Sequence, residues 1–181
     1  MRRAIGTTAM AMMVAAGISL SAQKTTQVHP GKGGSPHVKS EWTVDGANIS
    51  ITYGRPSLKG RDEAGPGRME PGKEWRTGAD EATTLTTDKM LMIGSLMIPA
   101  GTYTLYTVPG DKEWQLVVSK KTGQWGIPYP AGEDFGRTPM TVSKNAKPVE
   151  QLTITIDDTP AGGNLNVAWG SVKATAALMV H

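Results

Sequence analysis

Alternation of apolar and polar residues around an Asp-Gly dipeptide is the feature that most constrains this chain. Residues 42–44 and 49–53 alternate in this way on either side of Asp45-Gly46. Successive side chains of a strand point to opposite faces, so the pattern predicts two half-buried strands. Asp-Gly between two such runs is typical of a tight hairpin turn. The segment therefore predicts an antiparallel β-hairpin.

Similar short runs recur along the rest of the chain, separated by glycine, proline and aspartate. They cover residues 83–87, 90–93, 96–98, 103–107, 114–119, 152–156, 165–169 and 172–180. No segment keeps a helical period. This spacing predicts an all-β fold, an antiparallel β-sandwich of about nine short strands. Two irregular stretches, residues 56–77 and 123–139, predict two long loops, which in compact domains commonly carry function.

The first residues predict an export signal. Arg2-Arg3 precede an uncharged, mostly apolar run from Ala9 to Leu20, and small residues follow. This is the order of a secretory signal peptide over residues 1–22, with cleavage after Ser21 or Ala22. The apolar run is shorter than the roughly 20 residues that a membrane-spanning helix needs, so an uncleaved anchor is the weaker alternative. We expect a periplasmic or secreted protein with no transmembrane span after cleavage.

The remaining chain divides into a polar lead-in and one domain. Residues 23–40 are rich in glycine and proline and predict a flexible lead-in, and residues 41–181 predict a single β-sandwich domain. Without the two signal arginines, the 19 basic and 16 acidic residues nearly balance. Nucleic-acid binding needs clustered excess positive charge, so no nucleic-acid partner is expected. The absence of cysteine excludes disulfides, thiol nucleophiles and thiolate metal sites.

The histidines limit the catalytic chemistry. His29 and His37 fall in the predicted lead-in, and His181 is the last residue given. A Ser-His-Asp triad or a histidine zinc site needs histidines fixed on the scaffold. A metal clip between His29 and His37 remains an alternative, but the favoured interpretation is two solvated histidines. We therefore expect no metal and no other cofactor.

A concentration of basic and aromatic residues is the candidate binding site. Arginine binds carboxylates and phosphates in a fork, and tryptophan or tyrosine faces stack on sugar rings or guanidinium planes. The candidate ligand-binding residues are Tyr53, Arg55, Arg61, Trp75, Arg76, Glu81 and Trp125. The structural alternative is that the arginines pair with Asp80 or Glu81 and hold the long loop against the strands.

Several motifs occur together in a characteristic order. They are Ile49-Ser-Ile-Thr-Tyr-Gly-Arg-Pro-Ser-Leu-Lys-Gly-Arg61, Trp75-Arg-Thr-Gly-Ala-Asp-Glu-Ala-Thr83, Ile98-Pro-Ala-Gly-Thr-Tyr103, Tyr106-Thr-Val-Pro-Gly110 with Trp114, and Gly123-Gln-Trp-Gly126. In this combination the chain resembles the bacterial family catalogued as domain of unknown function 2911, over about residues 35–180. The resemblance implies an exported β-rich domain, and it implies no activity, substrate or cofactor. Asp80 stands where the family pattern usually has asparagine.

The favoured hypothesis is a non-enzymatic binding module of the cell envelope, with an unidentified envelope ligand or protein as partner. Basic and aromatic loop residues and the lack of a fixed catalytic histidine support it. One alternative is a hydrolase that uses paired carboxylates, with Glu81 as a member. A structural or partner-binding scaffold is the other, because a β-rich fold does not choose among these functions.

Overall fold

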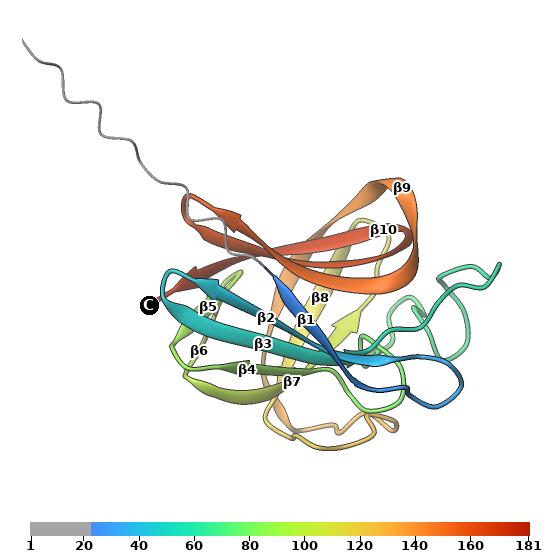
Figure 1. Ribbon diagram of the computed structural model, residues 1–181, viewed down its shortest axis with the longest axis horizontal. Helices are drawn as coiled ribbons and strands as arrows, with labels where there is room; N and C mark the ends of the chain where they lie inside the picture. Colours follow the sequence, from blue (N-terminus) through green and yellow to red (C-terminus); the bar gives the residue numbers. More distant parts are fainter. Residues whose placement is uncertain (1–22) are drawn as a thin grey trace, which may run out of the picture.

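In the computed structural model, residues 23–181 are described and contain ten β-strands and no helix (Figure 1). The strands are β1 (Lys24–His29), β2 (His37–Val44), β3 (Ala47–Gly54), β4 (Thr84–Thr87), β5 (Leu91–Ile93), β6 (Leu96–Ile98), β7 (Gly101–Val108), β8 (Glu113–Ser119), β9 (Asp134–Thr159) and β10 (Gly162–Val180). No helix in this part of the chain is long and apolar enough to cross a membrane. The expected signal peptide, residues 1–22, lies outside the described residues.

The ten strands form one antiparallel sheet, in the order β1-β2-β3-β4-β7-β8-β9-β10-β5-β6. The all-β prediction is confirmed, but hydrogen bonds join the strands into a single sheet, and the two separate sheets of a sandwich are not seen. The sheet curves, so β9 and β10 return to contact β2. Figure 1 shows these two long strands lying across β2 and β3.

The predicted hairpin is confirmed as β2 and β3. Val44 pairs with Ala47 next to the turn. Asp45 and Gly46 both have positive φ, 46° and 74°, as the tight hairpin turn requires. Alternate residues of both strands are buried, which is the arrangement that the period-two pattern predicts.

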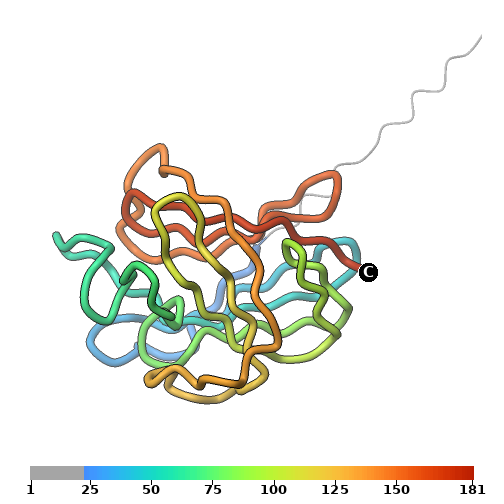
Figure 2. Tube along the Cα trace, turned by 180° about the vertical axis from the view of Figure 1, so that it is seen from behind, coloured from blue at the N-terminus to red at the C-terminus, as the bar shows by residue number. Residues whose placement is uncertain are grey.

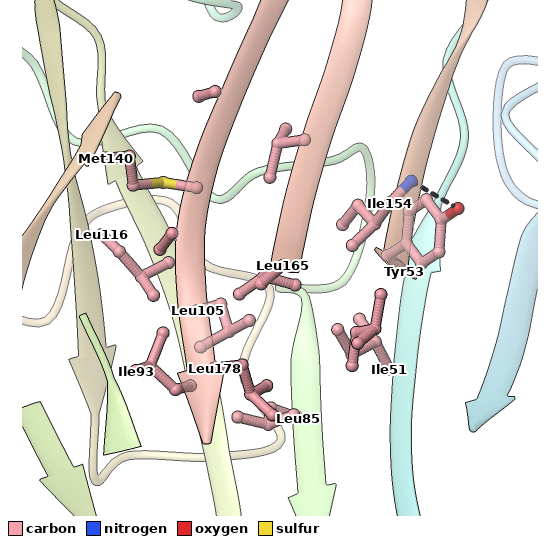
Figure 3. Packing of buried hydrophobic residues seen from close by; sticks show 14 of the residues in the cluster. Ile51, Tyr53, Leu85, Ile93, Leu105, Leu116, Met140, Ile154, Leu165 and Leu178 are labelled. Carbon is pink, nitrogen blue, oxygen red and sulfur yellow. Dashed lines mark hydrogen bonds between the residues drawn. The ribbon is translucent and has the colours of Figure 1, made fainter. Parts of the chain in front are cut away.

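The main core lies inside the curve of the sheet. Figure 3 shows leucine and isoleucine side chains from β3, β4, β5, β7, β8, β9 and β10 meeting there, with Tyr53 at one side. Three tryptophans extend this core below the long loop. Trp75 stacks on Trp169 with ring centroids 5.8 Å apart, and its ring meets Trp114 edge to face at 6.5 Å. Trp114 is thus a core residue, as its place in an alternating run predicts.

A smaller cluster on the outer face of β7 and β8 fixes the loop between β8 and β9. Tyr106 and Val117 are fully buried there, and Tyr129 of the loop packs edge to face on Tyr106 with centroids 4.9 Å apart. The side-chain amide of Gln124 donates to the Tyr106 hydroxyl over 3.3 Å. The loop is therefore packed on the sheet. It is shorter than predicted, because residues from Asp134 onward belong to β9.

The segment predicted as a flexible lead-in is the main correction to the sequence analysis. Residues 24–29 form β1, which pairs with β2 across residues 37–41. β1 lies at the edge of the sheet and is exposed along almost its whole length, so it needs no apolar period. The other long loop, residues 55–83, is irregular as predicted, and part of it (teal in Figure 2) projects from one end of the molecule.

Candidate functional site

The first two strands bring two histidines together. His29 ends β1, His37 begins β2, and the two are paired in the ladder. Their imidazole rings stack with centroids 4.2 Å apart and planes 18° from parallel. The side chain of His37 is only 2% exposed, whereas that of His29 is 41% exposed. The prediction of two solvated histidines is therefore wrong for His37.

A tight turn after Trp75 places two acids beside these histidines. The backbone of Trp75 pairs with Thr107 of β7, which anchors the start of the turn. Thr77 and Asp80 then adopt positive φ, 56° and 62°. Such conformations are costly for residues other than glycine, and most of all for a β-branched one such as threonine. The turn persists because the Thr83 hydroxyl donates to the Thr77 carbonyl over 2.9 Å.

The turn also needs a glycine on β3. A Cβ atom at Gly54 would lie 2.2 Å from the Ala79 carbonyl oxygen and 2.6 Å from His37 Nε2. Any larger residue would have to displace the backbone of the turn or the buried ring. Gly54 therefore allows the turn and His37 to approach the same point of the sheet.

The four side chains His29, His37, Asp80 and Glu81 form what we call the histidine–acid site. Glu81 Oε2 lies 3.1 Å from His37 Nε2 and 3.7 Å from His29 Nε2. Asp80 Oδ2 lies 3.6 Å from His37 Nε2 and accepts a hydrogen bond of 2.7 Å from the backbone N–H of Lys32. Two parts of the chain that are far apart in the sequence, residues 29–37 and 80–81, thus meet in one group of titratable side chains.

The two rings differ in burial and hydrogen bonding. Burial lowers the pKa of His37 below its ordinary value of 6.5, and the attraction of Glu81 does not offset this effect. The His37 ring is therefore neutral at neutral pH. Its Nε2 atom is buried and makes no hydrogen bond of good geometry, although Glu81 and the Ala79 carbonyl lie nearby and both favour the protonated form. In contrast, His29 Nδ1 accepts a hydrogen bond of 3.1 Å from the Gly31 N–H.

An exposed tryptophan and two cations border this site. Trp125 is 41% exposed, and Lys32 Nζ and Arg76 Cζ lie over its ring, 5.1 Å and 5.4 Å from the centroid. Arg76 Nη1 donates to the Trp125 carbonyl over 3.1 Å and to the Asp80 carbonyl. Arg76 therefore joins the acidic turn to the loop that carries Trp125. Of the predicted site residues, the structure brings together Arg76, Glu81 and Trp125.

The predicted residues Tyr53 and Arg55 lie elsewhere and join β3 to β9. The Tyr53 hydroxyl accepts a hydrogen bond of 2.9 Å from the Ile154 N–H (Figure 3). Arg55 Nε donates to the Leu152 carbonyl and Nη2 to the Thr153 hydroxyl, each over 2.9 Å. Both side chains thus satisfy polar groups along β9.

Arg61 and Trp75 also have local roles. Arg61 donates to the carbonyls of Leu58 and Ser57, over 2.9 Å and 3.0 Å, and so closes the turn that follows β3. Trp75 is 4% exposed and belongs to the tryptophan core. A hollow of about 200 Å³ borders Trp75 and Arg76, but Glu81 does not line it.

Sequence reasoning gave His29 and His37 only as a weaker metal-clip alternative and did not name Lys32. They lie in the segment predicted to be irregular, which carries no apolar pattern. The available signal was the pair of histidines on either side of a turn rich in glycine and proline, since such a turn can bring the ends of two strands together. Asp80 was named as a partner for the arginines in the structural alternative.

Comparison with known proteins gives a family and nothing finer. No curated protein and no solved structure matches the chain. One family model, described as a protein of unknown function (DUF2911), matches residues 35–178. His37, Asp80, Glu81 and Trp125 fall inside the matched region, and His29 precedes it. The chain therefore belongs to the DUF2911 family.

Proposed function

We propose that this protein is an exported, non-enzymatic binding module of the cell envelope, periplasmic or released, whose ligand site is the histidine–acid site. The observation that carries the proposal is the buried, unpartnered His37 Nε2 atom, which faces the carboxylates of Asp80 and Glu81. The ligand is a component of the envelope or a solute that enters it.

The cost of the arrangement supports a binding role. A buried polar atom without a partner costs about 1–3 kcal/mol. Each residue held in an unfavourable region of φ and ψ, here Thr77 and Asp80, costs a further 1–3 kcal/mol or so. Unfavourable arrangements of this kind concentrate at functional sites. A ligand that occupies Nε2 would recover part of this free energy.

The polarity of the site indicates the class of ligand. Two carboxylates and a neutral imidazole all offer electron pairs, so the ligand must be an electron-pair acceptor or a hydrogen-bond donor. Metal ions, ammonium groups and sugar hydroxyls meet this requirement. Trp125 adds a partly exposed aromatic surface at the border, where a larger ligand would extend.

The same geometry argues against the hydrolase alternative. Paired-carboxylate hydrolases place their two carboxyl groups about 5–10 Å apart on either side of the scissile bond. Asp80 and Glu81 both contact the buried His37 ring, with carboxylate oxygens 3.6 Å and 3.1 Å from its Nε2 atom, so neither carboxylate is free of a protein partner. Asp80 also accepts a hydrogen bond from the Lys32 backbone, which leaves it less available as an acid or base.

A ligand screen by thermal shift tests the binding role. Envelope glycans, peptidoglycan fragments, ammonium compounds and metal ions would be tested on the wild type, Glu81→Gln and Trp125→Ala, with Glu113→Gln, an exposed glutamate on β8, as the matched control. A ligand present at 100 times its Kd raises the stability of the native state by about 2.7 kcal/mol. We expect one class to stabilise the wild type and Glu113→Gln but not Glu81→Gln. Equal responses in all four proteins would refute the proposed site.

Export has its own test. The intact gene would be expressed in a bacterial host, and the protein recovered from the periplasm or medium would be analysed by mass spectrometry. We expect the mature chain to begin at Ala22 or Gln23. Full-length protein retained in the cytoplasm would contradict the export proposal.

A further inference from the structure

We infer that the ligand of the histidine–acid site is a divalent transition-metal ion, with Zn²⁺ as the best fit, bound through His29 Nε2, His37 Nε2 and Glu81 Oε2. This inference rests on the proposed binding function and narrows its ligand to one chemical class. One ligand atom from each of the three residues lies within 4.8 Å of the other two.

The two separations from Glu81 to the histidine nitrogens fit tetrahedral coordination. Zinc–nitrogen and zinc–oxygen bonds of roughly 2.0–2.1 Å place neighbouring tetrahedral ligand atoms about 3.3 Å apart. Glu81 Oε2 lies 3.1 Å from His37 Nε2 and 3.7 Å from His29 Nε2, on either side of that value. The two imidazole rings are stacked and only 18° from parallel, so at least one of them would have to turn before both Nε2 lone pairs point at one ion.

The direction of the His37 contact is the second geometric argument. Glu81 Oε2 lies close to Nε2 but makes no hydrogen bond with it. Two ligands of one metal ion have this relation, because each aims its lone pair at the ion and not at the other ligand. His37 is 2% exposed, so water has little access to Nε2 in place of a ligand. The metal would supply the partner that this atom lacks.

The donor set selects the class of metal. Imidazole suits zinc, copper, nickel and iron, whereas calcium and magnesium prefer sites made only of oxygen atoms. Two imidazoles and one carboxylate also leave one tetrahedral position open for water or a further ligand. Asp80 stands next to His37 and adds a second negative charge, which with Glu81 balances a divalent cation.

Binding would require a change at His29. Its Nδ1 atom accepts the Gly31 N–H, so in the neutral ring the proton lies on Nε2, which faces Glu81. Coordination through Nε2 moves that proton to Nδ1, and the hydrogen bond from Gly31 is then lost. A hydrogen bond of this kind contributes about 1 kcal/mol. The turn between β1 and β2 should therefore shift when the metal binds.

Metal titration of the purified protein tests this inference. Protein expressed from the full gene would be stripped with a chelator and titrated with Zn²⁺ by calorimetry. Binding of Cu²⁺ would be followed by electron paramagnetic resonance. We expect one Zn²⁺ per chain and a Cu²⁺ spectrum with nitrogen coupling from two imidazoles. Loss of one ligand in His29→Ala or Glu81→Gln should weaken Zn²⁺ binding at least tenfold. Removal of a residue that only hydrogen-bonds to a metal ligand already lowers metal affinity by about 10-fold or more.

Matched controls and a third variant complete the test. His181→Ala and Glu113→Gln remove an exposed histidine and glutamate outside the site and should bind Zn²⁺ as the wild type does. Because His37 is buried, His37→Gln would be used only after its thermal unfolding shows a folded protein. Equal Zn²⁺ affinity in the wild type, His29→Ala and Glu81→Gln would overturn the inference, as would the absence of binding. If metals fail but an ammonium compound or glycan protects the wild type and not Glu81→Gln, the binding function stands and the metal does not.

Discussion

Replacing Tyr53 with phenylalanine tests whether this predicted site residue stabilises the fold or binds the ligand. The hydroxyl accepts the backbone N–H of Ile154, which is fully buried. In Tyr53→Phe that N–H keeps no partner, and an unsatisfied buried donor costs about 1–3 kcal/mol. For a domain of this size, each kcal/mol lowers Tm by about 2–4 °C. A loss of about 2 kcal/mol would therefore lower Tm by roughly 4–8 °C.

The assay is thermal unfolding by circular dichroism, with Tyr103→Phe as the control. The Tyr103 hydroxyl donates to the Pro99 carbonyl over 3.0 Å, and Pro99 is exposed, so water can replace the lost donor. We expect the control to change stability by less than about 0.5–1 kcal/mol. Tyr53→Phe should also leave binding at the histidine–acid site unchanged. A Tyr53→Phe protein as stable as the control, or one that is stable but fails to bind, would refute this reasoning.

Two further changes test the loop contacts. Burial alone would raise the pKa of Glu63, but hydrogen bonds from the hydroxyl and N–H of Ser171 lower it below its ordinary 4.5. This contact therefore stabilises the fold above pH 4.5, and its contribution is lost as the pH falls through the lowered pKa. Urea denaturation midpoints at several pH values should fall less steeply with acid in Glu63→Gln than in the wild type. Trp75→Ala should lower the free energy of unfolding, measured by urea denaturation, by about 3–5 kcal/mol, the usual range for a buried aromatic. Trp125→Ala should lower it by less than about 1 kcal/mol, because that ring is 41% exposed. Similar costs for the two tryptophans would contradict the assignment of one to the core and the other to the surface.

The parts of the fold that follow from local patterns could be predicted from the sequence. Alternation and Asp45-Gly46 predict β2 and β3 because one face of each strand must be buried and the turn needs positive φ. β1 could not be predicted in this way. Its residues are exposed, and it exists because its backbone pairs with β2. The order of the sheet was equally hidden, since no local pattern indicates that β10 pairs with β5.

The candidate site shows the same division. Arg76, Glu81 and Trp125 were found because unusual residue types cluster in loops, and chemistry alone marks them as candidates. Tyr53 and Arg55 share those residue types, yet their polar atoms bond to β9, which is distant in the sequence. His37 was predicted to be solvated, because its burial depends on tertiary contacts with the turn at residues 77–80. Residue type identified candidates, and only the packing shows which of them are free to bind.

The place of β10 in the sheet has a consequence for the order of folding. This strand pairs with β9 and also with β5, and the His181 N–H donates to the Met90 carbonyl over 3.0 Å. In the strand pairing of the described residues, the β5–β6 hairpin therefore joins the sheet only through β10. Contacts between such distant segments slow folding, because a long loop must close before they form. Because the chain is synthesised from its N-terminus, the sheet stays incomplete until β10 has been made. For the export proposed above, this delay would leave the chain unfolded for longer before it crosses a membrane.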